Sequence, residues 1–362
     1  HRPMIGGNLV VTYFDMEQAY AEMLAAIGGA RRCVCLASYI FRSDATGRRF
    51  VDALKAAVAR GVTVYVLIDG VGERYSWPPI TRLLARAGIR HARFIPLRLV
   101  PPSLHVNLRN HRKLLIVDGR TGFTGGLNIG GSRKAMIDAH FRLTGPIVTQ
   151  LAQVFTEDWH FATGEHIDLA PPPDDNEPAG PAACRTITDG PDDDIGKLAL
   201  IIEAAISAAR KSVRIMTPYF LPRLEMIVAL KCAALRGVTV DIVLPARSNL
   251  PYVDWATRNL LEHIIKWDVN VYYQPPPFAH SKLLVIDDRY SQIGSANMDP
   301  RSLRLNFEIA VEVLDDGLAL QLARHFDATV DRSERVSLQD VEGRSLPARI
   351  RDSIAWLFSP YL

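Results

Sequence analysis

The sequence lacks the marks of several common protein classes. Its four cysteines form no C-x-x-C pair and no zinc-ligand spacing, so reduced thiols are expected rather than a disulfide scaffold. The formal net charge is only +3 over 362 residues, which argues against a polybasic nucleic-acid binder. No apolar run reaches the roughly 18 residues that a membrane-spanning helix needs. P-loop, H-E-x-x-H and carboxylate-cluster patterns are also missing, so we expect neither a metal nor a cofactor.

What the sequence does contain is a large apolar fraction and internal duplication. Hydrophobic residues make up 48% of the chain, and its length has room for two domains. Residues 53–64 are echoed by residues 229–240: in both, a helix ends at an Arg-Gly pair and a β-branched strand follows. Strands and helices alternate around both stretches. This pattern predicts an α/β sandwich in each half, with a largely parallel sheet.

A compositional break separates the two halves. Residues 171–194 are rich in Pro, Asp, Gly and Ala and show no hydrophobic periodicity. We therefore expect an N-terminal half over residues 1–170, a linker over 171–194 and a C-terminal half over 195–362. Residues 346–357 carry apolar side chains at helical spacing. A helix docked on the core is the favoured interpretation, and a membrane-facing helix is the alternative.

The most informative repeat is the pattern H-x-K-x4-D, which occurs at 111–118 and again at 280–287. In a strand, residues i and i+2 point to the same face, so each His and its Lys should project together. Two copies in one register indicate a single site built from both halves, with a nucleophile from one half and an acid from the other. The predicted catalytic residues are those of the two motifs, namely His111, Lys113 and Asp118, and His280, Lys282 and Asp287.

Within each motif the aspartate has a different expected role from the histidine. Asp118 and Asp287 end their strands, so they are better placed to hold backbone or basic groups than to attack a substrate. The imidazoles suit chemistry at phosphorus, since one can act as nucleophile while the other transfers protons. Lysines and amides around them would bind an anion that spreads one charge over two oxygens, which favours a phosphodiester.

Further residues repeat downstream of each motif. Asn128 and Asn297 lie at equal offsets from the two histidines and can donate amide hydrogen bonds to an anionic oxygen. Small residues before them let the backbone approach a ligand. An acidic residue follows each motif, 27 residues after the first His and 28 after the second, and either could fix an imidazole tautomer or be an ordinary surface carboxylate. These supporting residues are Gly126, Asn128 and Asp138, and Ser295, Asn297 and Glu308.

These residues resemble the phospholipase D superfamily, whose signature is the duplicated H-x-K-x4-D. The chain is most similar to bacterial cardiolipin synthases of the phospholipase D type, on the evidence of residues 110–113, 125–128, 217–220, 294–302 and 306–308. The resemblance covers nearly the whole chain. It implies two tandem α/β/α sandwich halves related by a pseudo-two-fold axis, with the active site at their interface.

The resemblance also implies a mechanism of two transfers. His111 would attack a phospholipid phosphorus and form a phosphohistidine. His280 would protonate the leaving alcohol and then activate a hydroxyl of a second phosphatidylglycerol, so that cardiolipin forms and glycerol leaves. The acidic partners would cross between the halves, with Glu308 supporting His111 and Asp138 supporting His280.

The expected partners are phospholipids. Phosphatidylglycerol, and possibly phosphatidylethanolamine as a second substrate, would be met at the cytoplasmic side of the bacterial inner membrane, by peripheral contact. Many members of the family begin with two membrane helices, whereas this sequence begins at His1 without one or a signal peptide. We therefore expect either that such helices were removed or that the protein binds membranes peripherally.

Three other functions remain open from the sequence. A phosphodiesterase acting on nucleic acid is disfavoured by the modest charge, and no nucleic-acid partner is expected. A hydrolytic phospholipase D would use the same chemistry with water as acceptor. A non-catalytic protein that binds anionic lipid headgroups is disfavoured because both motifs are intact.

Overall fold

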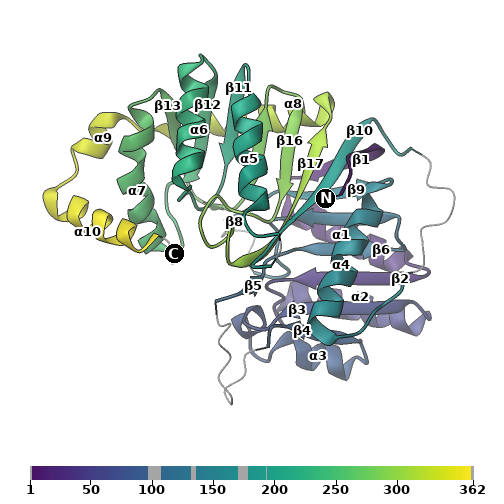
Figure 1. Cartoon of the computed structure of the whole chain (residues 1–362). Coiled ribbons are helices and arrows are strands. Elements are labelled where there is room, and N and C mark those ends of the chain that lie inside the picture. The colour runs from purple at the N-terminus through teal and green to yellow at the C-terminus, as the bar shows by residue number, and fades with distance from the viewer. Residues whose placement is uncertain (1, 97–106, 132–135, 170–177, 193, 360–362) are drawn as a thin grey trace.

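The computed structural model describes residues 2–96, 107–131, 136–169, 178–192 and 194–359 (Figure 1). The first repeat of elements fills the N-terminal half, drawn from purple to teal. Its elements are β1 (Ile5–Tyr13), α1 (Met16–Gly29), β2 (Cys33–Ser38), α2 (Ala45–Ala59), β3 (Thr63–Asp69), η1 (Gly72–Tyr75), α3 (Ile80–Arg86), β4 (His91–Phe94), β5 (Arg109–Asn110), β6 (Leu114–Val117), β7 (Thr121–Gly125), β8 (Met136–Ile137), β9 (His140–Thr144) and α4 (Ile147–Thr163).

The second repeat follows the same order in the C-terminal half and adds a short tail. Its elements are β10 (Ala182–Asp189), α5 (Lys197–Ala208), β11 (Ser212–Met216), α6 (Leu224–Leu235), β12 (Thr239–Pro245), α7 (Pro251–Ile265), β13 (Val269–Gln274), β14 (Phe278–Ala279), β15 (Leu283–Ile286), β16 (Tyr290–Gly294), β17 (Asn306–Leu314) and α8 (Asp316–Val330), then β18 (Glu334–Arg335), α9 (Leu338–Glu342) and α10 (Leu346–Leu357). The α/β duplication predicted from the sequence is confirmed.

The strands of both halves form one 16-stranded sheet, in the order β18-β13-β12-β11-β15-β16-β17-β10-β1-β9-β7-β6-β2-β3-β4, with β5 added beside β17. Only β2, β3 and β4, and likewise β11, β12 and β13, pair in parallel along this path. The prediction of a largely parallel sheet is therefore wrong. After each motif, tight turns join neighbouring strands, and such hairpins are antiparallel.

The predicted linker contains a strand. Residues 182–189 form β10, which pairs with β17 on one side and with β1 on the other. In the order of elements β10 is the counterpart of β1, so the second repeat begins at Ala182 rather than at residue 195. The strand was missed because its buried positions are filled by small and polar residues such as Ala182 and Thr186, which weaken the hydrophobic alternation. Residues 171–177 and 193 lie outside the described part.

The two halves share a hydrophobic core. One cluster joins Phe141, Leu151 and Phe155 of the first half to Val311 and Phe326 of the second. Dense packing of this kind resists relative movement, because few alternative arrangements fill the same space. The shared core and the continuous sheet therefore fix the two halves, and the residues they carry, relative to each other.

The tail ends in α10, which Figure 1 shows at the outer edge of the C-terminal half. Asp352 and Ala355 of this helix are buried, and it packs along α7. The docked helix predicted from the sequence is thus confirmed, although Leu346, Ile350 and Ile354 remain exposed on it. Within the described residues, no helix combines the length and the apolar character needed to cross a membrane.

Candidate active site

Each motif histidine is anchored to the opposite half through the backbone. His111 follows β5, which pairs in parallel with the start of β17, and the His111 N–H donates to the Phe307 carbonyl at 2.9 Å. His280 follows β14, which pairs with β8, and its N–H donates to the Ile137 carbonyl at 2.7 Å. These reciprocal two-residue pairings form the seam between the repeats. They bring both histidines to one place, as the duplicated motif predicts.

The carboxylates cross the same seam. His111 Nδ1 lies 3.0 Å from Glu308 Oε2, and His280 Nδ1 lies 2.7 Å from Asp138 Oδ2. The crossed pairing expected from the family resemblance is therefore confirmed by geometry. A carboxylate that accepts from Nδ1–H holds the imidazole in the tautomer whose Nε2 carries a lone pair. In both halves the nitrogen available for chemistry is thus Nε2.

Burial keeps the two imidazoles neutral. It lowers the pKa of His111, and the Glu308 carboxylate offsets only part of this effect. Burial, together with the Lys282 ammonium, lowers the pKa of His280 to about 4. Burial opposes ionisation of the carboxyl groups as well. The interaction and hydrogen bond with the paired imidazole, together with the neighbouring lysine, outweigh it and lower the pKa of both Asp138 and Glu308. Near pH 7 each pair is a neutral imidazole on a charged carboxylate.

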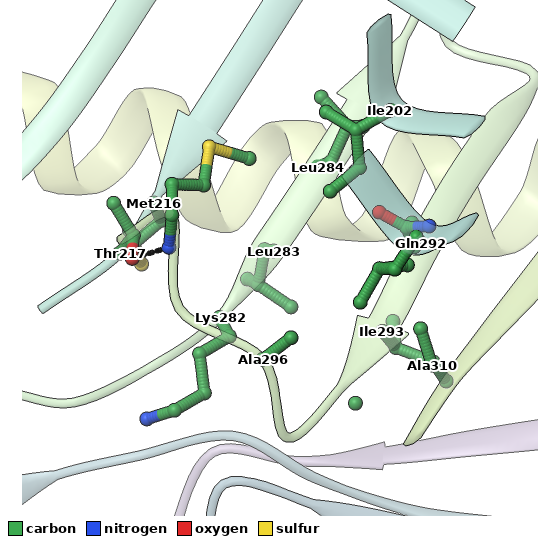
Figure 2. A pocket seen from close by; sticks show the side chains of 13 residues that line it. Ile202, Met216, Thr217, Lys282, Leu283, Leu284, Gln292, Ile293, Ala296 and Ala310 are labelled. Atoms are coloured by element: carbon green, nitrogen blue, oxygen red, sulfur yellow. Dashed lines mark hydrogen bonds between the residues drawn. The ribbon is translucent and has the colours of Figure 1, made fainter. Parts of the chain in front are cut away.

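The motif lysines are buried beside the histidines. Burial lowers the pKa of Lys113 to about 7 and that of Lys282 to about 8. Lys113 Nζ donates to the His111 carbonyl at 2.7 Å, and Lys282 Nζ lies 3.1 Å from His280 Nε2, the nitrogen that carries the lone pair. Figure 2 shows the Lys282 side chain pointing away from the apolar side chains of Leu284 and Ile202. Two buried cations with lowered pKa values favour the arrival of an anion, which would stabilise their charged forms.

The residues expected to support the site divide into two kinds. Ser295 Oγ donates to Glu308 at 2.5 Å, whereas at Gly126 an added Cβ would lie 2.4 Å from Asp138 Oδ1. These two small residues therefore make room for the carboxylates rather than for a ligand directly. Asn128 and Asn297 both line the cavity between the halves. Asn128 Oδ1 accepts from the Ile40 N–H at 3.2 Å, which leaves its amide NH2 for other partners.

Asp118 and Asp287 lie at the other end of their strands. The Asp118 carboxylate accepts from the backbone N–H groups of Arg31, Arg32 and Cys33 at 2.8–2.9 Å. Asp287 accepts in the same way from residues 210–212. The prediction that these two aspartates belong to the catalytic set is therefore corrected, because a four-residue strand separates each from its lysine. Their backbone-holding role is the one that their position at the strand end indicates.

A cavity of about 760 Å³ opens between the halves. Both motif histidines line it, together with aromatic side chains that include Tyr39, whose ring lies 5.1 Å from that of His111. This tyrosine directly follows β2 and lies at the rim of the cavity. Arg109, two residues before the first motif, lines the cavity, whereas Arg112, inside the motif, is buried in an ion pair with Asp158.

Several polar residues of the cavity were not identified from the sequence. Among them are Asp299, Arg301 and Asn306, all between the second motif and Glu308. The first two belong to a turn in which the Ser302 N–H donates to Asp299 Oδ1 at 2.8 Å. A signal was present, since these residues lie within the stretches that resemble cardiolipin synthases. Nothing in the local pattern indicates that they face a ligand, because that depends on pairing across the seam.

Comparisons with known proteins agree with this geometry. A family described as "Cardiolipin synthase, PLD-like domain" matches residues 23–159 and 202–330. The major cardiolipin synthase ClsA of Bacillus subtilis (strain 168) is 33% identical over 371 aligned residues, which cover 100% of this chain and 77% of that protein. Cardiolipin synthase A of Pseudomonas entomophila (strain L48) is also 33% identical, covering 99% of this chain and 76% of its own.

A solved structure supports the fold. The crystal structure of a phosphatidylserine synthase from Haemophilus influenzae Rd KW20 covers 100% of this chain and 98% of its own, with a TM-score of 0.78 at 14% identity. At that identity the likeness bears on the fold alone, and it agrees with the duplicated α/β architecture. The family match and the similarity over the whole of this chain show which family the protein descends from. The chain belongs to the family of cardiolipin synthases built from phospholipase D-like domains.

Proposed function

We propose that this protein is a phosphatidyltransferase that joins two phosphatidylglycerol molecules into cardiolipin and releases glycerol. The observation that carries the proposal is a single cavity lined by two neutral imidazoles, each oriented by a carboxylate from the opposite half. Similarity to known cardiolipin synthases over 99–100% of this chain supports the choice of substrate and product. The catalytic residues of the proposal are His111, Lys113, His280 and Lys282.

In the first transfer, His111 Nε2 attacks the phosphorus of one phosphatidylglycerol. A nitrogen–phosphorus bond forms, the bond from phosphorus to the glycerol headgroup oxygen breaks, and His280 gives that oxygen a proton. His280 is neutral in the empty site. A bound phosphate is negatively charged and favours the imidazolium form, so it raises the pKa of His280 and lets the ring carry the proton that it donates. The assignment of His111 as nucleophile is supported by the family resemblance.

In the second transfer, a hydroxyl of another phosphatidylglycerol attacks the phosphohistidine. His280 accepts the hydroxyl proton, the nitrogen–phosphorus bond breaks and a new phosphodiester forms. Lys113 and Lys282 are placed to neutralise the non-bridging oxygens, where negative charge concentrates in both transition states. Two phosphodiesters enter and both leave in cardiolipin, one newly formed and one unreacted, so the only small product is glycerol.

We further propose peripheral contact with the cytoplasmic side of the bacterial inner membrane. The support is the exposed apolar stripe of α10, whose members are four residues apart at Leu346, Ile350 and Ile354 and continue to Leu357. Arg349 lies on the same helix and adds a positive charge that suits anionic lipid, whereas Arg351 is ion-paired with Asp352. Ala355 of this helix packs with Val253, which lines the active-site cavity.

The test is product analysis by mass spectrometry. Purified protein is given vesicles of phosphatidylglycerol alone, and then vesicles that also contain phosphatidylethanolamine. We expect cardiolipin and free glycerol from phosphatidylglycerol alone. Phosphatidic acid as the main product would instead indicate a hydrolase, and an unchanged substrate in both arms would overturn the proposal. The mixed vesicles decide whether phosphatidylethanolamine contributes a phosphatidyl group.

A further inference from the structure

The second substrate of the proposed reaction brings a negative charge of its own to the cavity. The phosphate that reacts is met by Lys113 and Lys282, which lie beside the two histidines. The phosphate of the acceptor phosphatidylglycerol does not react, and a three-carbon glycerol separates it from the first. An anion that is drawn out of water needs a cation or hydrogen-bond donors in return. The cavity should therefore hold a second place for phosphate.

The chemistry fixes the part of the cavity in which that place lies. In the second transfer the acceptor hydroxyl bonds to phosphorus while the bond from phosphorus to His111 Nε2 breaks. The entering and leaving atoms are roughly in line, on opposite faces of the phosphorus. The hydroxyl also gives its proton to His280. The acceptor thus lies next to His280, and we call this part of the cavity the acceptor side.

The wall of the acceptor side can be followed outward from His280. The Phe278 ring lies 5.9 Å from that of His280, and Phe278 is the Cα partner of Met136 in the pairing of β14 with β8. Met136 packs on the hydrophobic cluster that contains Phe41 and Ile129. These last two residues form a parallel bridge between the loop after β2 and the loop after β7. Both loops therefore belong to the acceptor side.

Arg42 lies on this wall, half-buried, and lines the cavity. Its N–H donates to the Ile129 carbonyl at 2.9 Å, whereas its guanidinium makes no hydrogen bond or ion pair within the part of the chain that the structure describes. Gly130 makes room for it, because an added Cβ there would lie 2.7 Å from Arg42 Cβ. The Asp44 carboxylate is close to the same glycine, but it already accepts from two backbone N–H groups at 2.9 and 2.7 Å.

The pseudo-two-fold equivalent of Arg42 carries no charge. It is Leu221, which follows the equivalent bridge and donates its N–H to the Met298 carbonyl at 2.8 Å. Leu221 is only 3% exposed. The fold does not require a cation after the bridge, so the arginine of the first half calls for a reason other than packing.

The other arginines that line the cavity lie on the opposite side. Arg109 belongs to β5, two residues before His111. Arg301 donates to the carbonyl of Asn107, just before the same strand, at 3.4 Å. Among the described residues that line the cavity, Arg42 is therefore the arginine of the acceptor side.

We infer that Arg42 binds the unreacted phosphate of the acceptor phosphatidylglycerol. This inference rests on the proposed function and deepens it, because it names the residue that recognises the second substrate as a phosphodiester and not only as an alcohol. A guanidinium presents a fork of donors that matches two phosphate oxygens. The glycerol that joins the two phosphates passes Met136 and Phe278, whose apolar surfaces suit its carbon chain. Arg42 gives up no ion pair when the phosphate arrives.

The same geometry limits Arg42 to one of the two transfers. The glycerol that leaves in the first transfer carries no phosphate, so it has nothing for this guanidinium to bind. The acceptor of the second transfer carries one. Loss of Arg42 should therefore change the choice of acceptor and leave the formation of the phosphohistidine intact.

The experiment lets two soluble acceptors compete for that phosphohistidine. The full chain is given phosphatidylglycerol vesicles as donor, with equal concentrations of isotopically labelled glycerol and labelled glycerophosphoglycerol. Both offer a terminal hydroxyl on a three-carbon skeleton, but only the second carries a phosphodiester. In each transfer the nitrogen–phosphorus bond breaks, the hydroxyl oxygen bonds to phosphorus and its proton passes to His280. Mass spectrometry gives the ratio of the two labelled products, which is independent of the amount of active protein and of the first transfer.

We expect Arg42→Gln to lower the ratio of the glycerophosphoglycerol product to the glycerol product by about tenfold, the size of one lost hydrogen bond to a charged group. Arg42→Lys keeps the charge but loses the fork, so its ratio should lie between those of Arg42→Gln and wild type. Cardiolipin formed in the same vesicles, relative to labelled phosphatidylglycerol, should follow the same order. Arg42→Lys is the milder change and decides the test if Arg42→Gln does not fold.

Arg109→Gln is the matched control, because it removes one positive charge from the opposite side of the same cavity. Its product ratio should stay near the wild-type value. An equal fall in Arg109→Gln would mean that the total charge of the cavity selects the acceptor, which overturns the inference. An unaltered ratio in Arg42→Gln overturns it as well, while cardiolipin formation upholds the proposed function. Wild-type protein that makes no cardiolipin overturns the proposed function itself.

Discussion

Glu308 lies 3.0 Å from the ring of His111 although 197 residues separate them in the sequence. The contact exists because β5 and β17 pair across the seam and place the two side chains together. His280 and Asp138 repeat it in the equivalent pairing. Neither half therefore contains a complete imidazole–carboxylate pair, so the duplicated fold is a requirement for chemistry and not only a means of enlarging the core.

Removing one crossed carboxylate should reduce turnover more than binding. In Glu308→Gln the amide can no longer stabilise the imidazolium or fix the tautomer of His111, so we expect kcat to fall by about 100-fold or more with a small change in KM. The measurement is steady-state cardiolipin formation. Glu312→Gln is the matched control, because Glu312 lies on the same strand and pairs with Arg185, away from the cavity. Equal losses in the two variants would contradict the positioning role.

The two histidines should fail differently when the leaving group is changed. His111→Ala removes the nucleophile, so no covalent phosphorus adduct should form with any donor. His280→Ala removes the proton donor, which a donor with a nitrophenol leaving group does not need. With that donor we expect His280→Ala to accumulate a phosphorylated protein, detected by intact-protein mass spectrometry and located at His111. An adduct in His111→Ala at His280 would reverse the assignment of the nucleophile.

The lowered pKa values predict a bell-shaped dependence of kcat/KM on pH. Burial lowers the pKa of His111, so its nucleophilic neutral form is lost only at acidic pH. Lys113 and Lys282, with pKa values of about 7 and about 8, lose their charge in the free enzyme as pH rises through that range, and phosphate binding weakens with them. Lys113 loses its charge first, so in Lys113→Arg, where the charge persists, the alkaline limb should move up toward the pKa of about 8 of Lys282. An alkaline limb that does not move would contradict the role of Lys113.

The sequence predicted the site better than the sheet. The crossed carboxylates followed from the family resemblance, and the strand-end position of Asp118 indicated its contact with backbone. By contrast, β10 has small and threonine-rich buried positions, which give no strong alternation, and the strand stayed hidden in a Pro-rich segment. The position of Asp299 in the cavity was also not predicted, because it depends on a turn that is hydrogen-bonded across the seam to Asn107, just before β5.

Substituting the motif aspartate should cost stability rather than chemistry. Asp118→Ala leaves three backbone N–H groups without their carboxylate acceptor, which we expect to lower the free energy of unfolding by about 1–3 kcal/mol. The check is denaturant unfolding together with the specific activity of the protein that remains folded. That activity should stay near the wild-type value. A loss of turnover in fully folded Asp118→Ala would return this residue to the catalytic set.

The exposed stripe of α10 should govern membrane binding. The double substitution Ile350→Asp with Ile354→Asp places two carboxylates on the apolar face, where both residues are about half exposed and where no buried packing depends on them. We expect co-sedimentation with phosphatidylglycerol vesicles to fall about tenfold or more, because each change removes apolar area and adds repulsion from anionic lipid. Activity on detergent-dispersed substrate should persist, since neither residue lines the active-site cavity. The control is Leu320→Asp, an equally apolar and 43% exposed position on α8. If this control weakens vesicle binding as much as the α10 variant does, general surface charge and not the helix face controls attachment.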